Sequence, residues 1–260
     1  MSAPTLYVDK ETVLHALDPR AKVALVLGLF VAAYVFTDPR FVAVPFAVAL
    51  LALWYAGGLR NLLRLWFVLV MLFLVGFVVW PVYAPARGPV VLSTPVLAIT
   101  EHQFLFALGR STRIVAFIVA GFAFITTTSN EEIVRGMRGF KIPFAFCFAV
   151  GTALRLFPTF LGATGTVKQA QEARGLDLSE GGPIQQIRNY VPLLIPVLMT
   201  AVRQVNTQAM ALEARGFDAG RGRTFYAKEP FGPADWLATV AGILIAVGTI
   251  YARLLGIGVL

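Results

Sequence analysis

Two nearly identical stretches decide the fold: EARGLD, at Glu172–Asp177, and EARGFD, at Glu213–Asp218. They differ at one position, and each follows a long, mostly apolar segment. Gly175 and Gly216 stand where the glycine after a helix end is expected. The arginine before each glycine would meet the negative end of the helix dipole. Helix capping accounts for the Arg-Gly pair, but it leaves the preceding Glu-Ala and the following Asp unexplained.

Arg174 and Arg215 are the functional candidates in these stretches. In each copy the glutamate lies two residues before the arginine, and residues two apart do not face each other on a helix. A pair between each arginine and the aspartate across the cap, Asp177 or Asp218, stays open. Presented outward, a guanidinium offers a planar fork of donors that suits carboxylates or carbonyls in a groove. Two equivalent helix tips therefore predict two similar partner grooves, such as those of a pair of homologous ATPase subunits.

The composition indicates an integral membrane protein. Of the 260 residues, 58% are hydrophobic and 14% are charged, whereas ordinary soluble domains are about 45–50% apolar and about 25% charged. The formal net charge of +8 fits cytoplasmic loops rich in Lys and Arg, so nucleic acid is not an expected partner. The single cysteine, Cys147, cannot form an internal disulfide.

The apolar runs predict an all-α integral membrane protein with about five transmembrane helices and a cytoplasmic coupling module of long amphipathic helices. Ser129 or Asn130 is a good N-cap for the start of the module. Lys10, Arg20 and Lys22 place the N-terminus in the cytoplasm by the positive-inside rule. The expected domains are an N-terminal transmembrane part at 1–128 with spans near 20–37, 41–57, 62–83 and 110–128, a coupling module at 129–232 with long helices ending near 175 and 216, and a last span at 233–260.

The number of spans depends on the segments 142–175 and 184–216, which begin apolar and end polar. If both crossed the membrane, there would be seven spans, and Arg174 and Arg215 would lie on opposite sides. A helix of about 33 residues is also roughly 50 Å long, well beyond a hydrocarbon core of about 30 Å. Five spans are therefore favoured, with six or seven left open. Kinks or breaks are expected where prolines interrupt these segments, at Pro158, Pro192 and Pro196.

With these features the chain resembles the transmembrane T component, the EcfT family, of energy-coupling factor (ECF) vitamin transporters. In that family two long cytoplasmic coupling helices each end in an Ala-Arg-Gly motif, and these tips dock into grooves on two nucleotide-binding subunits. The stretch HALDPRAK at His15–Lys22 also resembles the family's approach to the first span. The matching residues are Ala173, Arg174, Gly175, Ala214, Arg215 and Gly216, supported by Glu172, Asp177, Glu213 and Asp218.

The resemblance implies a non-catalytic scaffold in the cytoplasmic (inner) membrane of a prokaryote. Such a subunit joins two ATP-binding cassette ATPases to one small substrate-binding membrane (S) subunit for vitamin or micronutrient uptake. The partners use ATP and Mg, and this chain is expected to bind no cofactor or metal. The S subunit would choose the vitamin or metal ion. Its apolar platform on this chain is expected to include Phe157, Pro158, Pro192, Pro196 and Met199.

A second motif lies where the chain first approaches the membrane. Asp18 can cap a helix that begins with Pro19. Arg20 and Lys22 are then expected to mark the cytoplasmic border of the first span.

Three other functions fit these residues less well. An enzyme is disfavoured because His15 and His102 have no metal-ligand spacing and the chain carries no Gly-x-x-x-x-Gly-Lys-[Ser/Thr] motif. A self-contained secondary transporter is expected to carry ionisable residues near mid-span. It is disfavoured because the candidate in the four N-terminal spans, Arg113, is expected at a span edge. A conventional ABC permease subunit would use one coupling loop per chain, whereas this chain has two tips.

Overall fold

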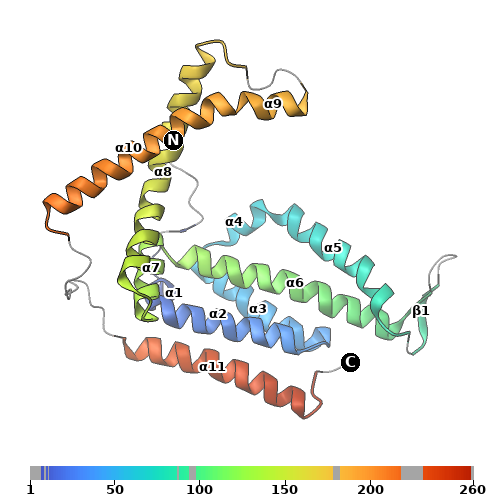
Figure 1. The fold of residues 1–260 in the computed structure, drawn as a ribbon. Helices are drawn as coiled ribbons and strands as arrows, with labels where there is room; N and C mark the ends of the chain where they lie inside the picture. Colours follow the sequence, from blue (N-terminus) through green and yellow to red (C-terminus); the bar gives the residue numbers. More distant parts are fainter. Residues whose placement is uncertain are drawn as a thin grey trace. The chain divides into compact units, whose positions relative to one another are not determined.

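The computed structural model describes residues 7–258, except 9, 11, 87, 94–97, 178–181 and 218–230. This part of the chain is helical apart from one short hairpin, so the all-α prediction is confirmed (Figure 1). The chain divides into two compact units. We call Met1–Lys141 with Glu229–Leu260 the bundle unit, and Ile142–Lys228 the central unit.

The bundle unit contains the helices that flank the central unit in sequence. Helix α6 packs against α3, α5 and α2, and α11 packs along α2. Strands β1 and β2 pair antiparallel between α5 and α6. The elements are α1 (Val13–Ala16), α2 (Pro19–Val35), α3 (Pro39–Ala56), α4 (Leu59–Arg64), α5 (Trp66–Tyr83), β1 (Val90–Ser93), β2 (Ala98–Thr100), α6 (Glu101–Thr127), α7 (Asn130–Gly139) and α11 (Pro233–Leu254).

Side-chain caps start several of these helices. The Asp18 carboxylate accepts a hydrogen bond from the Arg20 amide at 2.9 Å, and Pro19 is the first residue of α2, as predicted. Asp38 caps α3 in the same way. Ser129 caps α7 and forms a capping box with Glu132, which confirms one of the two expected caps. Short polar side chains accept backbone N–H groups that a helix start would otherwise leave unpaired.

Helix α6 is longer than the run expected at 110–128. It begins at Glu101, behind a capping box made by Thr100 and Gln103. Arg113 therefore lies in the middle of the helix and not near its start, and it is buried. Its guanidinium donates to the carbonyl of Phe36, just past the end of α2. A helix can continue through an arginine in an apolar run if the guanidinium finds a buried acceptor. Here the acceptor is a carbonyl that the end of another helix leaves unpaired.

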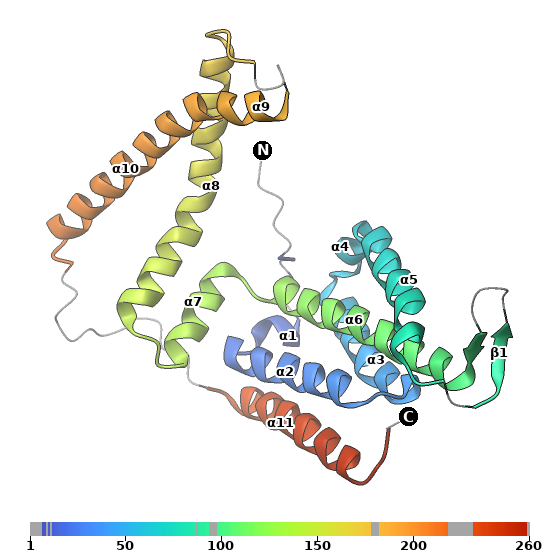
Figure 2. The same ribbon diagram turned by 45° about the vertical axis from the view of Figure 1, so that its right-hand side comes forward.

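Helices α2 and α11 run parallel and in close contact (Figures 1 and 2). A Cβ on Gly28 would lie 2.4 Å from the Gly242 carbonyl oxygen, so the two backbones touch. If α2, α3, α5 and α6 each cross the membrane in turn, a parallel α11 requires an even number of crossings between α6 and α11. Six spans are then excluded, and five or seven remain.

Five described helices are long and apolar enough to cross a membrane: α3, α5, α6, α8 and α11. The expected set of five contained α2 in place of α8. Helix α2 has 17 residues, about 26 Å at 1.5 Å per residue, which is near the lower limit for a span. Helix α8 has 29 residues, about 43 Å, which is longer than a hydrocarbon core of about 30 Å.

The central unit consists of α8 (Phe144–Glu172), α9 (Pro183–Asn189) and α10 (Val191–Ala214). Helix α8 continues through Pro158, and α10 continues through Pro196. The expected segment 184–216 breaks at Tyr190, just before Pro192, which lies in the first turn of α10. This position suits proline because the first turn needs no N–H donor.

Candidate partner-docking site

The first sextet closes α8 in a Schellman motif. Gly175 has a φ of +89°, in the left-handed region. The Leu176 amide donates to the Gln171 carbonyl at 3.0 Å, and the Gly175 amide donates to the Glu172 carbonyl at 3.0 Å. These two bonds satisfy carbonyls that the helix end would otherwise leave unpaired. We call residues 172–177 tip 1.

The second sextet closes α10 in the same register. Gly216 has a φ of +69°. The Phe217 amide donates to the Leu212 carbonyl at 2.9 Å, and the Gly216 amide donates to the Glu213 carbonyl at 2.8 Å. We call residues 213–217 tip 2; Asp218, the last residue of this sextet, lies outside the described residues. The predicted glycine caps are thus confirmed in both copies.

The two tips present the same residues to the outside. In each, the glutamate, alanine, arginine and glycine are exposed, and the residue after the glycine is half-buried. Glu172 forms an ion pair with Lys168 at 3.6 Å. Within the part of the chain that the structure describes, the guanidinium groups of Arg174 and Arg215 have no hydrogen bond or ion pair, and only their backbone amides are bonded, within the helix caps. Both guanidinium groups are therefore available to a partner.

Tip 1 is tied to the start of α10. The Gln171 side-chain amide donates to the Pro192 carbonyl at 3.3 Å. This carbonyl has no helical donor because Pro196, four residues later, lacks an N–H. The Asn189 side chain also donates to the Asp177 carbonyl at 3.0 Å.

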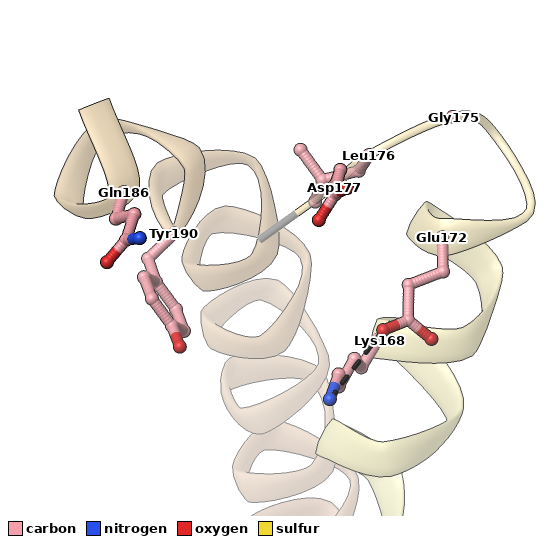
Figure 3. Close-up of a pocket in the computed structure, with 7 residues that line it drawn as sticks. All are labelled: Lys168, Glu172, Gly175, Leu176, Asp177, Gln186 and Tyr190. Atoms are coloured by element: carbon pink, nitrogen blue, oxygen red, sulfur yellow. Dashed lines mark ion pairs between the residues drawn. The ribbon is translucent and has the colours of Figure 1, made fainter. Parts of the chain in front are cut away.

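A polar pocket of about 700 Å³ opens beside tip 1. In Figure 3, Gln186 and Tyr190 lie on one side of it, and Lys168 and Glu172 lie on the other. Gly175, Leu176 and Asp177 complete the lining.

Tip 2 has a different neighbour. The Phe217 ring packs on Phe148, with centroids 4.7 Å apart, and on Phe144 at 6.2 Å. Tip 2 therefore lies beside the first turns of α8, while tip 1 lies beside the first turn of α10. The two tips stand at opposite ends of α10. Helix α10 has 24 residues, so at 1.5 Å per residue its ends are about 36 Å apart.

The residues expected to form the apolar platform lie on the helices between the tips. Phe157 is 61% exposed and Met199 is 59% exposed. Pro158 and Pro192 are exposed, and Pro196 is half-buried. Other exposed apolar side chains on these helices are Phe146, Leu161, Leu194, Ile195, Leu198 and Val202.

One residue of the motif at the start of α2 has contacts that the sequence did not predict. Arg20 is partly exposed and lies 3.7 Å from the Asp18 carboxylate. Lys22, which is expected to mark the membrane border, is also buried within the protein, with 4% of its surface exposed, and this burial was not predicted. Sequence reasoning missed this role because the three acceptors of the Lys22 ammonium come from residues 15, 127 and 132, two of them far away in the chain.

Comparison with known proteins gives one consistent result. A family model described as "CbiQ: Cobalt transport protein" matches residues 10–226. Proteins named "Energy-coupling factor transporter transmembrane protein EcfT" are similar along almost the whole chain. The relative from Thermosediminibacter oceani is 29% identical and covers 95% of this chain and 96% of its own. Those from Heliobacterium modesticaldum (29%; 93% and 94%) and Streptococcus thermophilus (28%; 94% and 95%) are comparable. The chain therefore belongs to the CbiQ/EcfT family of transporter membrane subunits.

Proposed function

We propose that this chain is the energy-coupling scaffold of an ECF-type ABC importer. It joins two homologous ATP-binding cassette ATPases to one small substrate-binding membrane subunit for the uptake of a vitamin or another micronutrient. The chain itself is non-catalytic, and its partners use ATP and Mg. Its place is the cytoplasmic membrane of a prokaryote, with the N-terminus and the central unit on the cytoplasmic side.

One observation carries the proposal: the same exposed, unpaired arginine stands on two identically capped helix ends. A helix cap alone requires only the glycine, and any residue could then stand in place of the arginine. A separation of about 36 Å along α10 also keeps the two arginines from reaching one groove. Two similar grooves on two similar subunits fit this arrangement.

The coupling is mechanical. ATP binding brings the two ATPase subunits together, and each groove carries one tip with it. Helices α8 and α10 pack on each other, so a movement of the tips changes their crossing. The apolar side chains between the tips then move against the substrate-binding subunit.

The test is a pull-down of the tagged chain from its native host in mild detergent, with the co-purifying proteins identified by mass. We expect two ATPases and a small hydrophobic protein with the wild-type chain. In Arg174→Ala/Arg215→Ala both ATPases should be lost. The matched control is Arg155→Ala/Arg203→Ala, because these arginines are also exposed and lie on α8 and α10. The control should retain the ATPases.

A wild-type chain that purifies without ATPases would overturn the proposal. So would a double mutant of the tips that keeps its ATPases and its uptake. Equal loss in the Arg155/Arg203 control would show that positive charge, and not the tip geometry, attracts the partners.

A further inference from the structure

The stretch Asp18–Lys22 at the start of α2 is the sequence motif that docking at the tips does not explain. Its residues contact both helices that border the central unit in sequence, namely α7 before it and α11 after it. All of these contacts lie within the bundle unit.

Lys22 makes the contacts of the motif with α7 and with the end of α6. Its ammonium donates to the His15 carbonyl at 3.0 Å, the Thr127 carbonyl at 2.6 Å and the Glu132 carboxylate at 3.1 Å. These bonds use all three donors of the ammonium group. Thr127 is the last residue of α6, and Glu132 lies in the first turn of α7. One buried cation therefore fixes the corner between α6 and α7, and a buried cation of this kind needs all of its partners.

Two glycines let α7 lie directly on the same motif. A Cβ on Gly136 would lie 2.9 Å from the Cβ of Pro19. A Cβ on Gly139 would overlap the Arg20 guanidinium, with 1.6 Å to its Nε. Gly139 is the last residue of α7, and the central unit begins three residues later. The point where the chain enters the central unit is thus packed on Pro19 and Arg20.

Asp18 makes the contact of the motif with α11. Its backbone amide donates to the Asp235 carboxylate at 2.7 Å, and the Gly232 amide donates to the other oxygen of that carboxylate at 2.9 Å. Asp235 is buried in the first turn of α11. The central unit ends at Lys228, shortly before this turn. The same five-residue motif therefore binds the helices on both sides of the central unit.

We infer that Asp18–Lys22, with Glu132 and Asp235, forms a clamp that fixes α7 and α11, the two helices that border the central unit in sequence. This inference rests on the proposed coupling function. If α7 and α11 could turn freely in the bundle unit, movement of the tips would be lost as rotation of these two helices. Because both helices are held on the start of α2, the movement instead changes the crossing of α8 and α10. Lys22, Glu132 and Asp235 are thus positioning residues for transport, and they need no contact with ATPase or substrate.

The experiment uses the complete transporter in proteoliposomes, with the substrate that the co-purified small subunit binds. Three quantities are measured: ATPase subunits per tagged chain, ATP hydrolysed, and substrate taken up. The variants are Lys22→Met, Glu132→Gln and Asp235→Asn. The matched control is Arg253→Gln, because Arg253 ties the opposite end of α11 to α2 by donating to the Val35 carbonyl at 2.9 Å.

For Glu132→Gln and Asp235→Asn we expect normal subunit content and continued ATP hydrolysis. Uptake per ATP should fall about tenfold, as for the loss of one charge-assisted hydrogen bond. Arg253→Gln should leave this ratio unchanged. The ratio separates positioning from simple stability, since a role in folding alone would lower the amount of complex and not its coupling. Should Lys22→Met fail to accumulate, the two milder variants decide.

An unchanged ratio in assembled Glu132→Gln and Asp235→Asn complexes would overturn the clamp and leave the proposed function intact. An equal fall in Arg253→Gln would also overturn it, because general α2–α11 packing would then be the cause. A wild-type chain that assembles with no ATPase would overturn the clamp together with the proposed function.

Discussion

The bundle unit and the central unit bury their residues very differently. In the bundle unit, α6 alone buries nine residues, among them Ser111, Arg113 and Thr126. In the described part of the central unit, α8 buries only Cys147 and α10 only Leu193. Helix α6 thus packs in a core, whereas α8 and α10, of similar length and hydropathy, bury almost nothing in the described residues. The outer bundle helix α11 also buries little, only Asp235 and Gly242.

This difference separates what the chain specifies by itself from what it leaves to its surroundings. The bundle helices are held by backbone contact at Gly28 and Gly242 and by buried cations at helix ends. The helices of the central unit keep large apolar side chains exposed between their tips. Large exposed apolar patches indicate a surface that meets protein or lipid. Under the proposed function, the bundle unit is a fixed frame, and the exposed surface of the central unit is where partners would bind.

The largest expected effect comes from breaking the frame. In Gly242→Leu the new Cβ would lie 2.5 Å from the Ala24 carbonyl oxygen, so α2 and α11 must separate. We expect a loss of about 3 kcal/mol or more, as for severe overpacking, and little folded protein in detergent. The control is Gly248→Leu on the same helix, where a Cβ meets nothing within 4 Å. Yield and thermal stability measure both, and equal stability of the two variants would contradict a backbone contact here.

The next effect concerns the arginines of the two tips, which are exposed and not part of the bundle unit. Arg174→Lys and Arg215→Lys keep the charge but lose the planar fork. Each should weaken binding of the ATPase pair about tenfold, or about 1.4 kcal/mol, as for one hydrogen bond to a charged group. Titration of the purified chain with ATPases measures this, and Arg155→Lys on α8 is the control. Wild-type affinity in both tip variants would show that a point charge suffices.

An effect of similar size, but confined to one cap, is expected where only the backbone of a tip is changed. A Cβ on Gly216 meets nothing within 4 Å, but the φ of +69° is unfavourable for alanine. Gly216→Ala should destabilise the cap by about 1–2 kcal/mol, and Gly216→Asn should cost less. Hydrogen exchange at the Phe217 amide, which closes the cap, reports the change. The amides of the bundle unit should keep their protection; faster exchange there would mean that the two units fold together.

Local chemistry explains what could be predicted from the sequence. The Asp18-Pro19 start of α2, the Ser129 cap and both glycine caps were predicted, because each depends on residues within one turn of the chain. The early start of α6 and the buried Lys22 were not. Arg113 and Lys22 look like the ends of apolar runs, and their partners lie on other helices. A hydropathy pattern cannot show which charged side chains find buried carbonyls after folding.

The smallest effect concerns the one position at which the two sextets differ. Phe217 in tip 2 packs against Phe144 and Phe148 with tilted rings, whereas Leu176 in tip 1 lines an open pocket. Phe217→Leu should therefore cost about 1 kcal/mol, the value of an aromatic pair, and loosen tip 2 against α8. Leu176→Phe should be close to neutral, because the pocket of about 700 Å³ leaves room for the ring.

Hydrogen exchange at the two caps, compared between these variants, measures the difference. Faster exchange at tip 2 in Phe217→Leu, with tip 1 unchanged in Leu176→Phe, would show that the substitution between the sextets follows from their neighbours on α8 and α9. Equal effects at both tips would mean that the aromatic contact does not hold tip 2. The exposed arginine and the glycine cap would then be the features that the two tips need in common, since the residue after the glycine could vary freely at either end.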